Sequence, residues 1–558
     1  MRTLSTEYGP CRLVAECPLG LALCLAAGAF VMFAPAAARL RAAGRALILE
    51  SGCLRFRLAL FCVAATCYGL ASILVFDGLP RIDDSVSALF QARIFASGRL
   101  YLPVPELGRF FTLFAVLGAR ENSPVWMTMY PPGWPALLTP GVLLGAPWLV
   151  NPMLGACLVV AVAAVAEDWF GRLPGRLAGL LALASPFLAS LAASHLSHTA
   201  TALMLMLCLL ATRRLLRHGG VWWGAAAGGS WGVAFLCRPL DALLVGVLIG
   251  LWPLFEWRRS LRAWRGVLAA ALLAAAAAAT LAAWQHVSTG SAWTAGHKAG
   301  MGRRGRYGFV RLDHVRSHTP ALGWNYTVRR IRVINERLLG WPVPSLLPVL
   351  LPFLLRCAGR QEWWLLGPWL GLLAAYMGYW YWEEEIPARY TSAGAPMLVV
   401  LAARGCAALD EVLASRRPGL VRPVHALGLA MFLFGATAGI ASVFGSFGPN
   451  FFDVENCLAK TIREAGITNA VVFMGARGVA DTDGDAHNDF YATGFMRNTL
   501  ALDGDIVYAR DLGRDNAAMI RAYPGRRYYL YTFFRDSGRA EIRELGPDAA
   551  LIPRPAAP

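Results

Sequence analysis

The chain has 558 residues, of which 57% are hydrophobic and 16% are charged, and its mean hydropathy is +0.48. This composition is too apolar for an ordinary soluble globular protein of this length, and it predicts a membrane protein. The net charge of +17 could suggest a nucleic-acid-binding protein. Arginines in cytoplasmic loops of a membrane protein explain much of that excess, so nucleic acid is not expected as a partner.

Apolar stretches recur from residue 18 to residue 445, and a helix that crosses a bilayer needs about 20 mostly apolar residues. We therefore predict an all-α polytopic membrane protein with about 12–13 transmembrane helices. The candidate spans lie near residues 18–38, 58–76, 134–150, 155–170, 175–192, 195–212, 221–237, 239–256, 266–286, 343–357, 363–382, 393–409 and 422–445.

The composition changes after residue 445, where Asp, Asn, Arg and Tyr mix with short apolar runs. We predict a transmembrane domain over residues 1–445 and a small soluble α/β domain over residues 446–558. In the second domain, residues 453–465 are expected to form a helix, and AVVFMGA, DIVYA and RYYLYTF to form strands. Residues 481–489, DTDGDAHND, resemble a calcium-binding loop but lack its closing Glu, which leaves a polar turn as the alternative.

Arginine-rich loops set the expected orientation, because cytoplasmic loops of membrane proteins are enriched in Lys and Arg. Such loops occur at residues 39–57, 213–217, 258–265 and 416–422. If these loops are cytoplasmic, the opposite, outer face carries the loops at 77–133 and 287–342 and the C-terminal domain.

Strict alternation of the spans then fails at residues 134–150, which contain Pro135, Pro140 and Pro147. We expect this segment to be broken or re-entrant, since freed backbone groups at membrane depth are tolerated where neighbouring helices satisfy them. The alternative is that one helix elsewhere is miscounted.

The first outer loop begins with two carboxylates, Asp83 and Asp84, just after a predicted span. A short amphipathic helix follows, with Leu89 and Ile94 on its apolar face and Gln91 off it, and we expect it to lie at the membrane interface. A carboxylate there could act as a general base, accepting the proton of an attacking hydroxyl. Alternatively, both aspartates cap the helix.

Several motifs in order give the chain a resemblance to a known family. They are FQARIFASGRLY and YPPGWP in the first loop, SHLSHTATALMLMLCLL from Ser194, GVAFLCRPLDALL around Arg238, WQHVSTGS from Trp284, NERLLGWPVPSLLP from Asn335 and IPARYTSAGAPMLVVLAARG from Ile386. Over residues 58 to 410 the sequence resembles the multi-spanning C-type glycosyltransferases. It is most similar to the branch with the protein O-mannosyltransferases, the lipid A aminoarabinose transferase and the rhizobial lipopolysaccharide-core transferases.

The resemblance implies an inverting hexosyl- or pentosyltransferase that takes its sugar from a polyprenyl-phosphate carrier. Counting back from FQA, Asp84 falls on the family's aspartate and Ser85 replaces the second acid, whereas a direct reading of the pair would make Asp83 the aspartate. Because one carboxylate is lost, the sequence does not decide whether a divalent metal ion serves as cofactor. Relatives often carry a Lys before the Pro131–Pro132 pair, and Tyr130 stands there instead, so another cation must contact the donor phosphate.

Candidate cations are Arg238, Arg389 and the basic loop from His297 to His318, which could also touch anionic lipid headgroups. An arginine between apolar stretches is costly enough to need a reason, and its planar fork suits phosphate oxygens. A structural role for Arg238, paired with Asp241, is the alternative.

His198 and Glu385 complete the expected donor-binding set, together with Tyr130, Pro131 and Pro132. His195 and His198 are three residues apart, so they would share one helix face and could hold a metal, although no third ligand is evident. The run of three glutamates that includes Glu385 is more often a solvated face, and the aromatic residues before it are typical of an interfacial belt.

These features predict a multi-pass protein of the bacterial inner membrane that transfers sugar to an envelope glycan, lipid or protein on the outer face. A secondary transporter or an envelope-assembly protein without transferase activity is the alternative. The transporter would place ionisable residues near the bilayer midplane and often show an internal repeat, neither of which the sequence displays.

Overall fold

The structure is a computed structural model, and it describes residues 17–118, 123–256, 263–302, 306–312, 317–383, 385–447, 454, 456–477, 486–534 and 539–546. The predicted features at residues 258–262, 384 and 481–485 lie outside the described residues. The chain divides into two compact units. The helical unit comprises Met1–Ser72, Leu149–Thr280 and Tyr307–Ser446, and the sheet unit comprises Ile73–Trp148, Leu281–Arg306 and Phe447–Pro558.

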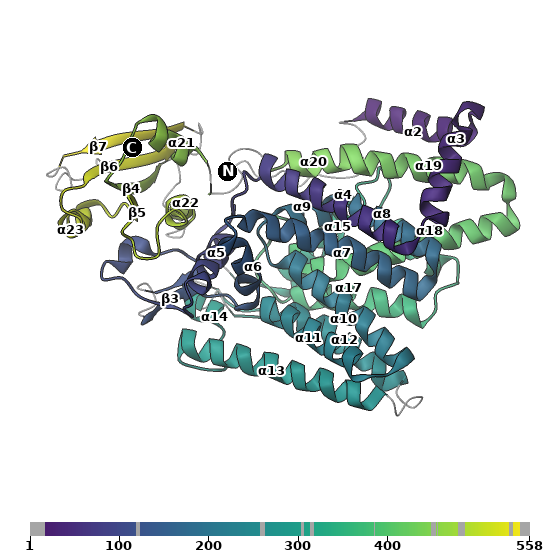
Figure 1. The fold of residues 1–558 in the computed structure, drawn as a ribbon, viewed down its shortest axis with the longest axis horizontal. Coiled ribbons are helices and arrows are strands. Elements are labelled where there is room, and N and C mark those ends of the chain that lie inside the picture. Colours follow the sequence, from purple (N-terminus) through teal and green to yellow (C-terminus); the bar gives the residue numbers. More distant parts are fainter. Residues whose placement is uncertain are drawn as a thin grey trace. The chain divides into compact units, whose positions relative to one another are not determined.

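Helices dominate the described residues up to 447 (Figure 1). Those that belong wholly or mainly to the helical unit are α2 (Pro18–Phe33), α3 (Ala38–Arg45), α4 (Cys53–Leu74), α7 (Pro147–Phe170), α8 (Arg172–Leu183), α9 (Pro186–Ala193), α10 (His198–His218), α11 (Val221–Cys237), α12 (Pro239–Glu256), α13 (Trp264–Thr289), α15 (Pro320–Arg337), α16 (Leu346–Leu354), α17 (Arg360–Tyr376), α18 (Ala395–Arg416), α19 (Val421–Phe434) and α20 (Ile440–Gly445).

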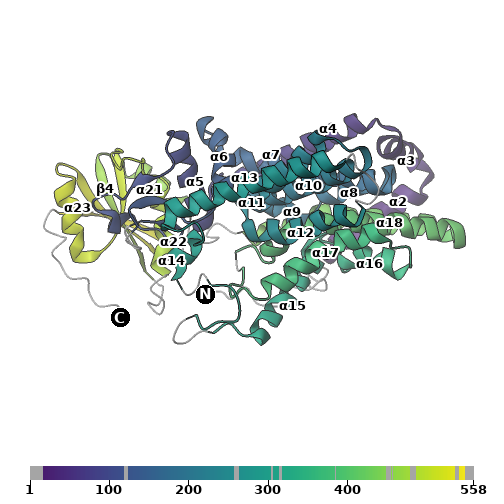
Figure 2. The same cartoon turned by 90° about the horizontal axis from the view of Figure 1, so that it is seen from below.

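Close helix packing in this unit depends on small residues. Gly224 and Gly228 lie four residues apart on α11, and a Cβ added at either would fall 2.4 Å or less from a backbone oxygen of α13. Such spacing lets two helix backbones approach, which is how helices in lipid gain packing energy. Around this pair, α10 packs against α11 and α12, and α17 packs against α12 and α18 (Figures 1 and 2).

Five helices among the described residues are long and apolar enough to cross a membrane. They are Cys53–Leu74, Pro147–Phe170, His198–His218, Trp264–Thr289 and Pro418–Gly445. Two bent pairs raise the number to seven if each pair crosses once. Proline begins the second half of each pair, at Pro35 and Pro186, where its fixed φ suits the first helical turn. The other predicted spans coincide with shorter helices or, at residues 393–409, with α18, a 22-residue helix that carries Arg404, Asp410 and Glu411. The count of 12–13 therefore stays a prediction.

The break expected within residues 134–150 is present. Helix α6 (Gly133–Leu143) has 11 residues and therefore spans only about 16 Å. A turn follows, and α7 begins at Pro147. Residues 134–150 are therefore not one continuous helix.

The sheet unit contains a four-stranded sheet in the order β5-β4-β6-β7 (Figure 1). Its strands are β4 (Ala470–Arg477), β5 (Ile506–Arg510), β6 (Arg527–Phe534) and β7 (Arg539–Leu545). β4 runs parallel to both neighbours and buries Val471, Val472 and Phe473 completely, as expected for a strand covered on both faces. The three predicted strands are present as β4, β5 and β6. Helices α21 (Cys457–Glu464), α22 (Ala486–Phe495) and α23 (Asn516–Ala522) complete this segment.

The first long loop joins the same hydrophobic core as this sheet. It contains α5 (Asp83–Ala96) and a small sheet of β1 (Leu102–Pro103), β2 (Val116–Leu117) and β3 (Val125–Thr128), and α14 (Gly296–Met301) packs beside β2. The Phe90 ring of α5 lies 4.7 Å from the Trp126 ring and 5.1 Å from the Phe495 ring. The amphipathic character expected for this helix is wrong, because α5 is buried on nearly all sides and has no solvated polar face. Even Gln91 is fully buried, where it bonds the backbone at Leu100 and Thr128.

Helix α15 presents one buried face to its unit, formed by Gly323, Thr327, Arg330 and Ile334. Near its end, Glu336 has one carboxylate oxygen that is buried without a hydrogen-bond partner among the described residues. Burial raises the pKa of Glu336 to about 7, against the opposing effect of Arg337 and Arg332. The folded state therefore favours the protonated acid.

The pKa of Glu336 is higher in the folded state than its usual value of 4.5, so protonation of this acid stabilises the folded state. This contribution to the free energy of unfolding is fully present below pH 4.5 and is lost as the pH rises through 7. We expect Glu336→Gln to raise the melting temperature of the detergent-solubilised protein at pH 8 and to change it little at pH 5. Glu411→Gln, at a side chain that is 69% exposed, is the control and should show no such difference. Equal shifts at both pH values for Glu336→Gln would contradict this assignment.

Candidate active site

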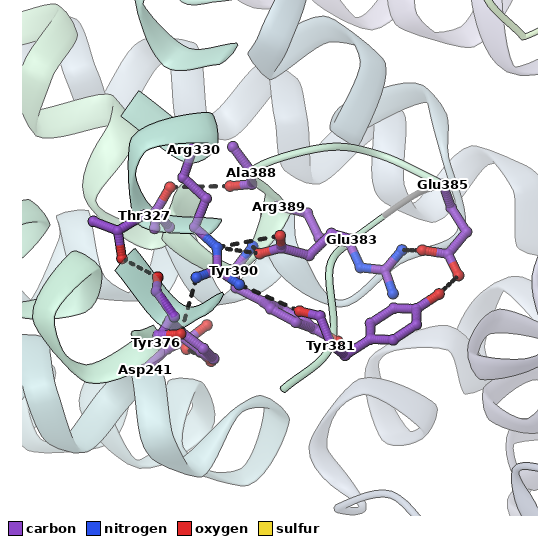
Figure 3. A network of polar contacts seen from close by, with 12 residues as sticks. Asp241, Thr327, Arg330, Tyr376, Tyr381, Glu383, Glu385, Ala388, Arg389 and Tyr390 are labelled. Carbon is purple, nitrogen blue, oxygen red and sulfur yellow. Dashed lines mark hydrogen bonds and ion pairs between the residues drawn. The ribbon is translucent and has the colours of Figure 1, made fainter. Parts of the chain in front are cut away.

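The segment from Tyr376 to Tyr390 connects α17 to α18 and carries most of the polar side chains of the helical unit's candidate site (Figure 3). The chain leaves the helix at Tyr376, turns at Ala388 with a left-handed φ of 65°, and enters a 3-10 helix, η8 (Arg389–Gly394), that leads into α18. Ala388 itself is fully buried. An alanine in this conformation is costly, and such residues persist where the surroundings hold them.

The Tyr390 ring is the centre around which the cationic side chains gather. The guanidinium carbon of Arg238 lies 5.5 Å from the ring centroid, and that of Arg389 lies 5.4 Å from it. The His198 ring stacks on Tyr390 at 6.5 Å and the Tyr376 ring at 5.0 Å. A ring face attracts cations, so Tyr390 holds both arginines near one place. The structure thus brings together three of the expected donor-binding residues, Arg238, Arg389 and His198.

Each arginine also has a carboxylate partner. Arg238 Nε donates to Asp241 Oδ2 at 2.5 Å, and the hydroxyl of Tyr376 donates to the other oxygen of Asp241. Arg389 Nη1 donates to Glu385 Oε2 at 2.5 Å. The pairing of Arg238 with Asp241, which the sequence offered as the structural alternative, is therefore present. With two guanidinium groups and two carboxylates, these four side chains carry no net charge.

His198 is the first residue of α10 and is only 2% exposed. Neither of its ring nitrogens has a hydrogen-bond partner among the described residues. A buried imidazole without partners is costly unless something else bonds to it, so it is available to a bound ligand. The expectation that His195 shares a helix face with His198 is wrong, because His195 lies in the turn before α10 begins. Burial lowers the pKa of His195 to about 4, so it is neutral at physiological pH.

The expectation that the glutamate run forms a solvated face is also wrong where the structure describes it. Glu383 is fully buried and pairs with Arg330 of α15, whose Nε lies 3.0 Å from Oε1. Glu385 is 8% exposed and accepts a hydrogen bond from the Tyr381 hydroxyl at 2.5 Å. Arg330 does not stand out in the sequence because its partner, Glu383, is 53 residues away.

The sheet unit holds the predicted catalytic pair. Tyr130 donates its hydroxyl to Asp84 Oδ1 at 2.5 Å, and Asp84 is half-buried whereas Asp83 is buried. Tyr130 is held in place through its backbone, because its carbonyl accepts from Trp284 Nε1 at 3.1 Å and its N–H donates to the Thr128 hydroxyl at 3.2 Å. A tyrosine hydroxyl therefore stands beside Asp84.

The alternative that these aspartates cap α5 is wrong in that neither of them is the N-cap residue. Ile82, not an aspartate, occupies the N-cap of α5 with no side-chain cap hydrogen bond, and the Ile82 N–H bonds Ser85 Oγ at 3.3 Å. Asp83 and Asp84 occupy the first turn, where the helix dipole favours negative charge. The remaining expected residues, Pro131 and Pro132, lead the chain from Tyr130 into α6, with Pro132 at its N-cap.

No group of three or more His, Cys, Asp or Glu side chains that could hold a metal ion occurs in the described part of the chain. His195 and His198 accordingly have no third ligand there. The calcium-like residues 481–485 belong to the part that is not described. The described residues therefore do not provide a metal-binding set.

A cavity of about 430 Å³ lies elsewhere in the helical unit, lined by Arg213, Trp252, Arg360 and Trp364 among others. Arg213 follows His198 by fifteen residues on α10, which corresponds to roughly 22 Å. The cavity is therefore at the opposite end of α10 from the Tyr390 cluster. We do not assign it to the same site.

The Asp241 carboxylate should be important for stability because it is fully buried beside Arg238. Asp241→Asn leaves that guanidinium without its counter-ion, and breaking a buried pair costs about 3–5 kcal/mol. We expect a clear drop in the melting temperature of the purified protein. Asp410→Asn, which disrupts the exposed pair with His425, is the control, since exposed pairs contribute about 0–1 kcal/mol. Equal melting temperatures for the two variants would contradict this view of Asp241.

No protein-family model matches the chain, and no curated protein matches it significantly. Solved structures do match. The aminoarabinose transferase ArnT from Cupriavidus metallidurans, bound to undecaprenyl phosphate, aligns with a TM-score of 0.52 and 14% identity over 86% of this chain and 93% of that chain. Its apo structure aligns with a TM-score of 0.51 and 13% identity over the same shares. The mycobacterial arabinofuranosyltransferase AftD matches at 0.43, with 16% identity over 85% of this chain and 36% of that chain, and this score establishes no shared fold.

The likeness to ArnT shows the fold. The chain has the C-type glycosyltransferase fold, as the order of its sequence motifs implied.

Proposed function

We propose that this protein is a membrane glycosyltransferase that moves a sugar from a polyprenyl-phosphate donor to an acceptor of the cell envelope. The observation that carries the proposal is the meeting of Arg238, Arg389 and His198 around Tyr390 within an apolar helical unit. The shared fold with ArnT, whose structure was solved with undecaprenyl phosphate, supports the same donor class. Fold alone does not fix an activity, so the side chains carry the argument.

In this proposal the arginine cluster binds the phosphate of the donor lipid. Guanidinium groups match phosphate oxygens in a bidentate way, and the imidazole of His198 can add an N–H donor. The phosphate of the donor carries one negative charge, and the departing polyprenyl phosphate gains a second. Donors already aimed at the place where that charge develops lower the barrier without reorganising. Asp241 and Glu385 keep the empty cluster neutral, so it is stable without a bound anion.

Asp84 is the proposed general base. It accepts the proton of the acceptor hydroxyl as the acceptor oxygen bonds to the anomeric carbon, and the bond from that carbon to the phosphate oxygen breaks. The electron pair leaves with the phosphate, which needs no proton, and attack from the opposite face inverts the configuration. The Tyr130 hydroxyl donates to Asp84, so it fixes the orientation of the carboxylate.

The location of the reaction is part of the proposal. Arginine-rich loops on the cytoplasmic side would place residues 77–133, 287–342 and 446–558 on the outer face of the inner membrane. The acceptor there would be an envelope glycan, lipid or protein.

Loss of the base should abolish transfer of the sugar. We expect Asp84→Asn to lower kcat at least about 100-fold in membranes given labelled sugar on polyprenyl phosphate, because general-base catalysis contributes about 10²- to 10⁴-fold. Asp83→Asn is the matched neighbour and should change kcat far less. Retained transfer in Asp84→Asn together with loss in Asp83→Asn would move the role to Asp83. If neither variant, at matched expression, loses transfer, then neither aspartate is the base.

Loss of a phosphate contact should weaken donor binding. Arg389→Lys keeps the charge but loses the planar fork, and we expect KM for the donor to rise about tenfold with a smaller change in kcat. The double variant Arg389→Gln with Glu385→Gln removes both charges of one pair, so it loses the cation without leaving a carboxylate unpaired. Arg217→Gln, at the far end of α10, is the control. An unchanged KM in both Arg389 variants would remove Arg389 from the donor site.

The same assay separates the competing function classes. If wild-type membranes transfer no sugar from any polyprenyl-phosphate donor, while they do accumulate a labelled solute, a transporter becomes the better account. If they neither transfer sugar nor accumulate a solute, an envelope-assembly protein becomes the better account.

A further inference from the structure

Arg330 and Glu383 form an ion pair whose side chains are both fully buried. Arg330 Nε lies 3.0 Å from one carboxylate oxygen of Glu383 and 3.2 Å from the other. Arg330 lies on the buried face of α15, and Glu383 lies in the segment from Tyr376 to Tyr390. The pair therefore joins a helix to the segment that carries the candidate site.

The rest of the Arg330 guanidinium contacts the backbone of the same segment (Figure 3). Nη1 donates to the Tyr376 carbonyl at 2.9 Å, and Nη2 donates to the Tyr381 carbonyl at 3.3 Å. The partner carboxylate reaches the far end of the segment, because Glu383 Oε1 accepts from the Tyr390 N–H at 3.4 Å. One ion pair thus contacts the beginning, the middle and the end of this segment.

Stability alone is a poor reason for such a pair. Removing two charges from water is expensive, and replacing a buried ion pair with apolar residues is often neutral or stabilising. A buried pair is better suited to select one conformation among several, because only the arrangement that satisfies every donor and acceptor avoids the cost of burial.

We propose that the Arg330–Glu383 pair positions Tyr390, and through Tyr390 the two arginines that bind the donor phosphate. The pair makes no contact with the donor in this account, so Arg330 and Glu383 are positioning residues. The proposal rests on the proposed function for its effect on donor binding. Its effect on the order of the segment is independent of that function.

A second contact shows that α15 is seated closely on this segment. A Cβ added at Gly323, seven residues before Arg330 and about two turns away, would fall 2.3 Å from the Met377 carbonyl oxygen. Thr327 lies between them on the same face, and its hydroxyl donates to the Gly323 carbonyl. This hydroxyl therefore needs no hydrogen-bond partner in the segment. Gly323 and Arg330 thus bring the same helix face against the same segment.

The test uses the full-length protein in detergent and compares three variants. Arg330→Met removes the cation, and Arg330→Met with Glu383→Met removes both charges and leaves none unpaired. Arg332→Met, on the exposed face of the same helix, is the control. Hydrogen exchange of residues 376–390 is measured without lipid, the Kd for undecaprenyl phosphate is measured by titration, and kcat and KM are measured for sugar transfer.

We expect the double variant to melt near the wild-type temperature, yet to exchange faster over residues 376–390 and to bind undecaprenyl phosphate about tenfold more weakly. KM for the donor should rise about tenfold while kcat falls less. Arg332→Met should match the wild type in all of these. A merely structural role predicts instead that the double variant recovers exchange, Kd and KM together with its melting temperature.

The outcomes separate this inference from the proposed function. If the double variant keeps wild-type exchange over residues 376–390, the positioning role is overturned whatever the lipid does. If exchange accelerates but Kd and KM do not change, the pair orders the segment without serving the donor, and the inference fails in that part. If the wild type neither binds undecaprenyl phosphate nor transfers sugar, the proposed function fails, and accelerated exchange in the double variant still supports the ordering of the segment.

Discussion

Charge that is buried in an apolar helical unit must be balanced, and the segment from Tyr376 to Tyr390 is organised by this requirement. Three guanidinium groups and three carboxylates meet along it, and each arginine has its own acid. The pairing fixes where the guanidinium groups point, since a buried charge without a partner is far costlier than a paired one. The aromatic rings of the segment then supply faces on which the cations rest. A site made in this way can be neutral when empty and still present two cations to an anion.

In the sheet unit, packing holds the Asp84 carboxylate at the start of helix α5. Asp84 lies in the first turn of α5, and α5 is packed into the core that the first loop shares with the C-terminal sheet. Aromatic contacts of Phe90 with Trp126 and Phe495 fix the helix. The general base that we propose at Asp84 needs such support, because its geometry has to be kept while the acceptor exchanges. The C-terminal residues therefore contribute to the setting of Asp84 through packing.

Sequence alone was enough to pick out the arginines of the candidate site but not the arrangement that holds them. Arg238 and Arg389 stood out because arginine among apolar residues is costly and needs a reason. Tyr390 and Arg330 did not, because aromatic residues near helix ends usually form an interfacial belt and the partner of Arg330 is distant in the chain. The burial of Glu383 could not be predicted from the sequence, because a run of acidic residues is usually solvated. The number of spans could not be fixed either, because several apolar stretches form helices shorter than a full crossing.

Photo-crosslinking of a diazirine-bearing polyprenyl phosphate to the protein in native membranes, followed by peptide mapping, tests the central claim most directly. The account predicts that a probe attached near the phosphate labels the segment from Tyr376 to Tyr390 and the start of α10, and that excess undecaprenyl phosphate suppresses the labelling. Labelling confined to the opposite end of α10, around Arg213 and Arg360, would contradict the assignment of the phosphate site to the Tyr390 cluster.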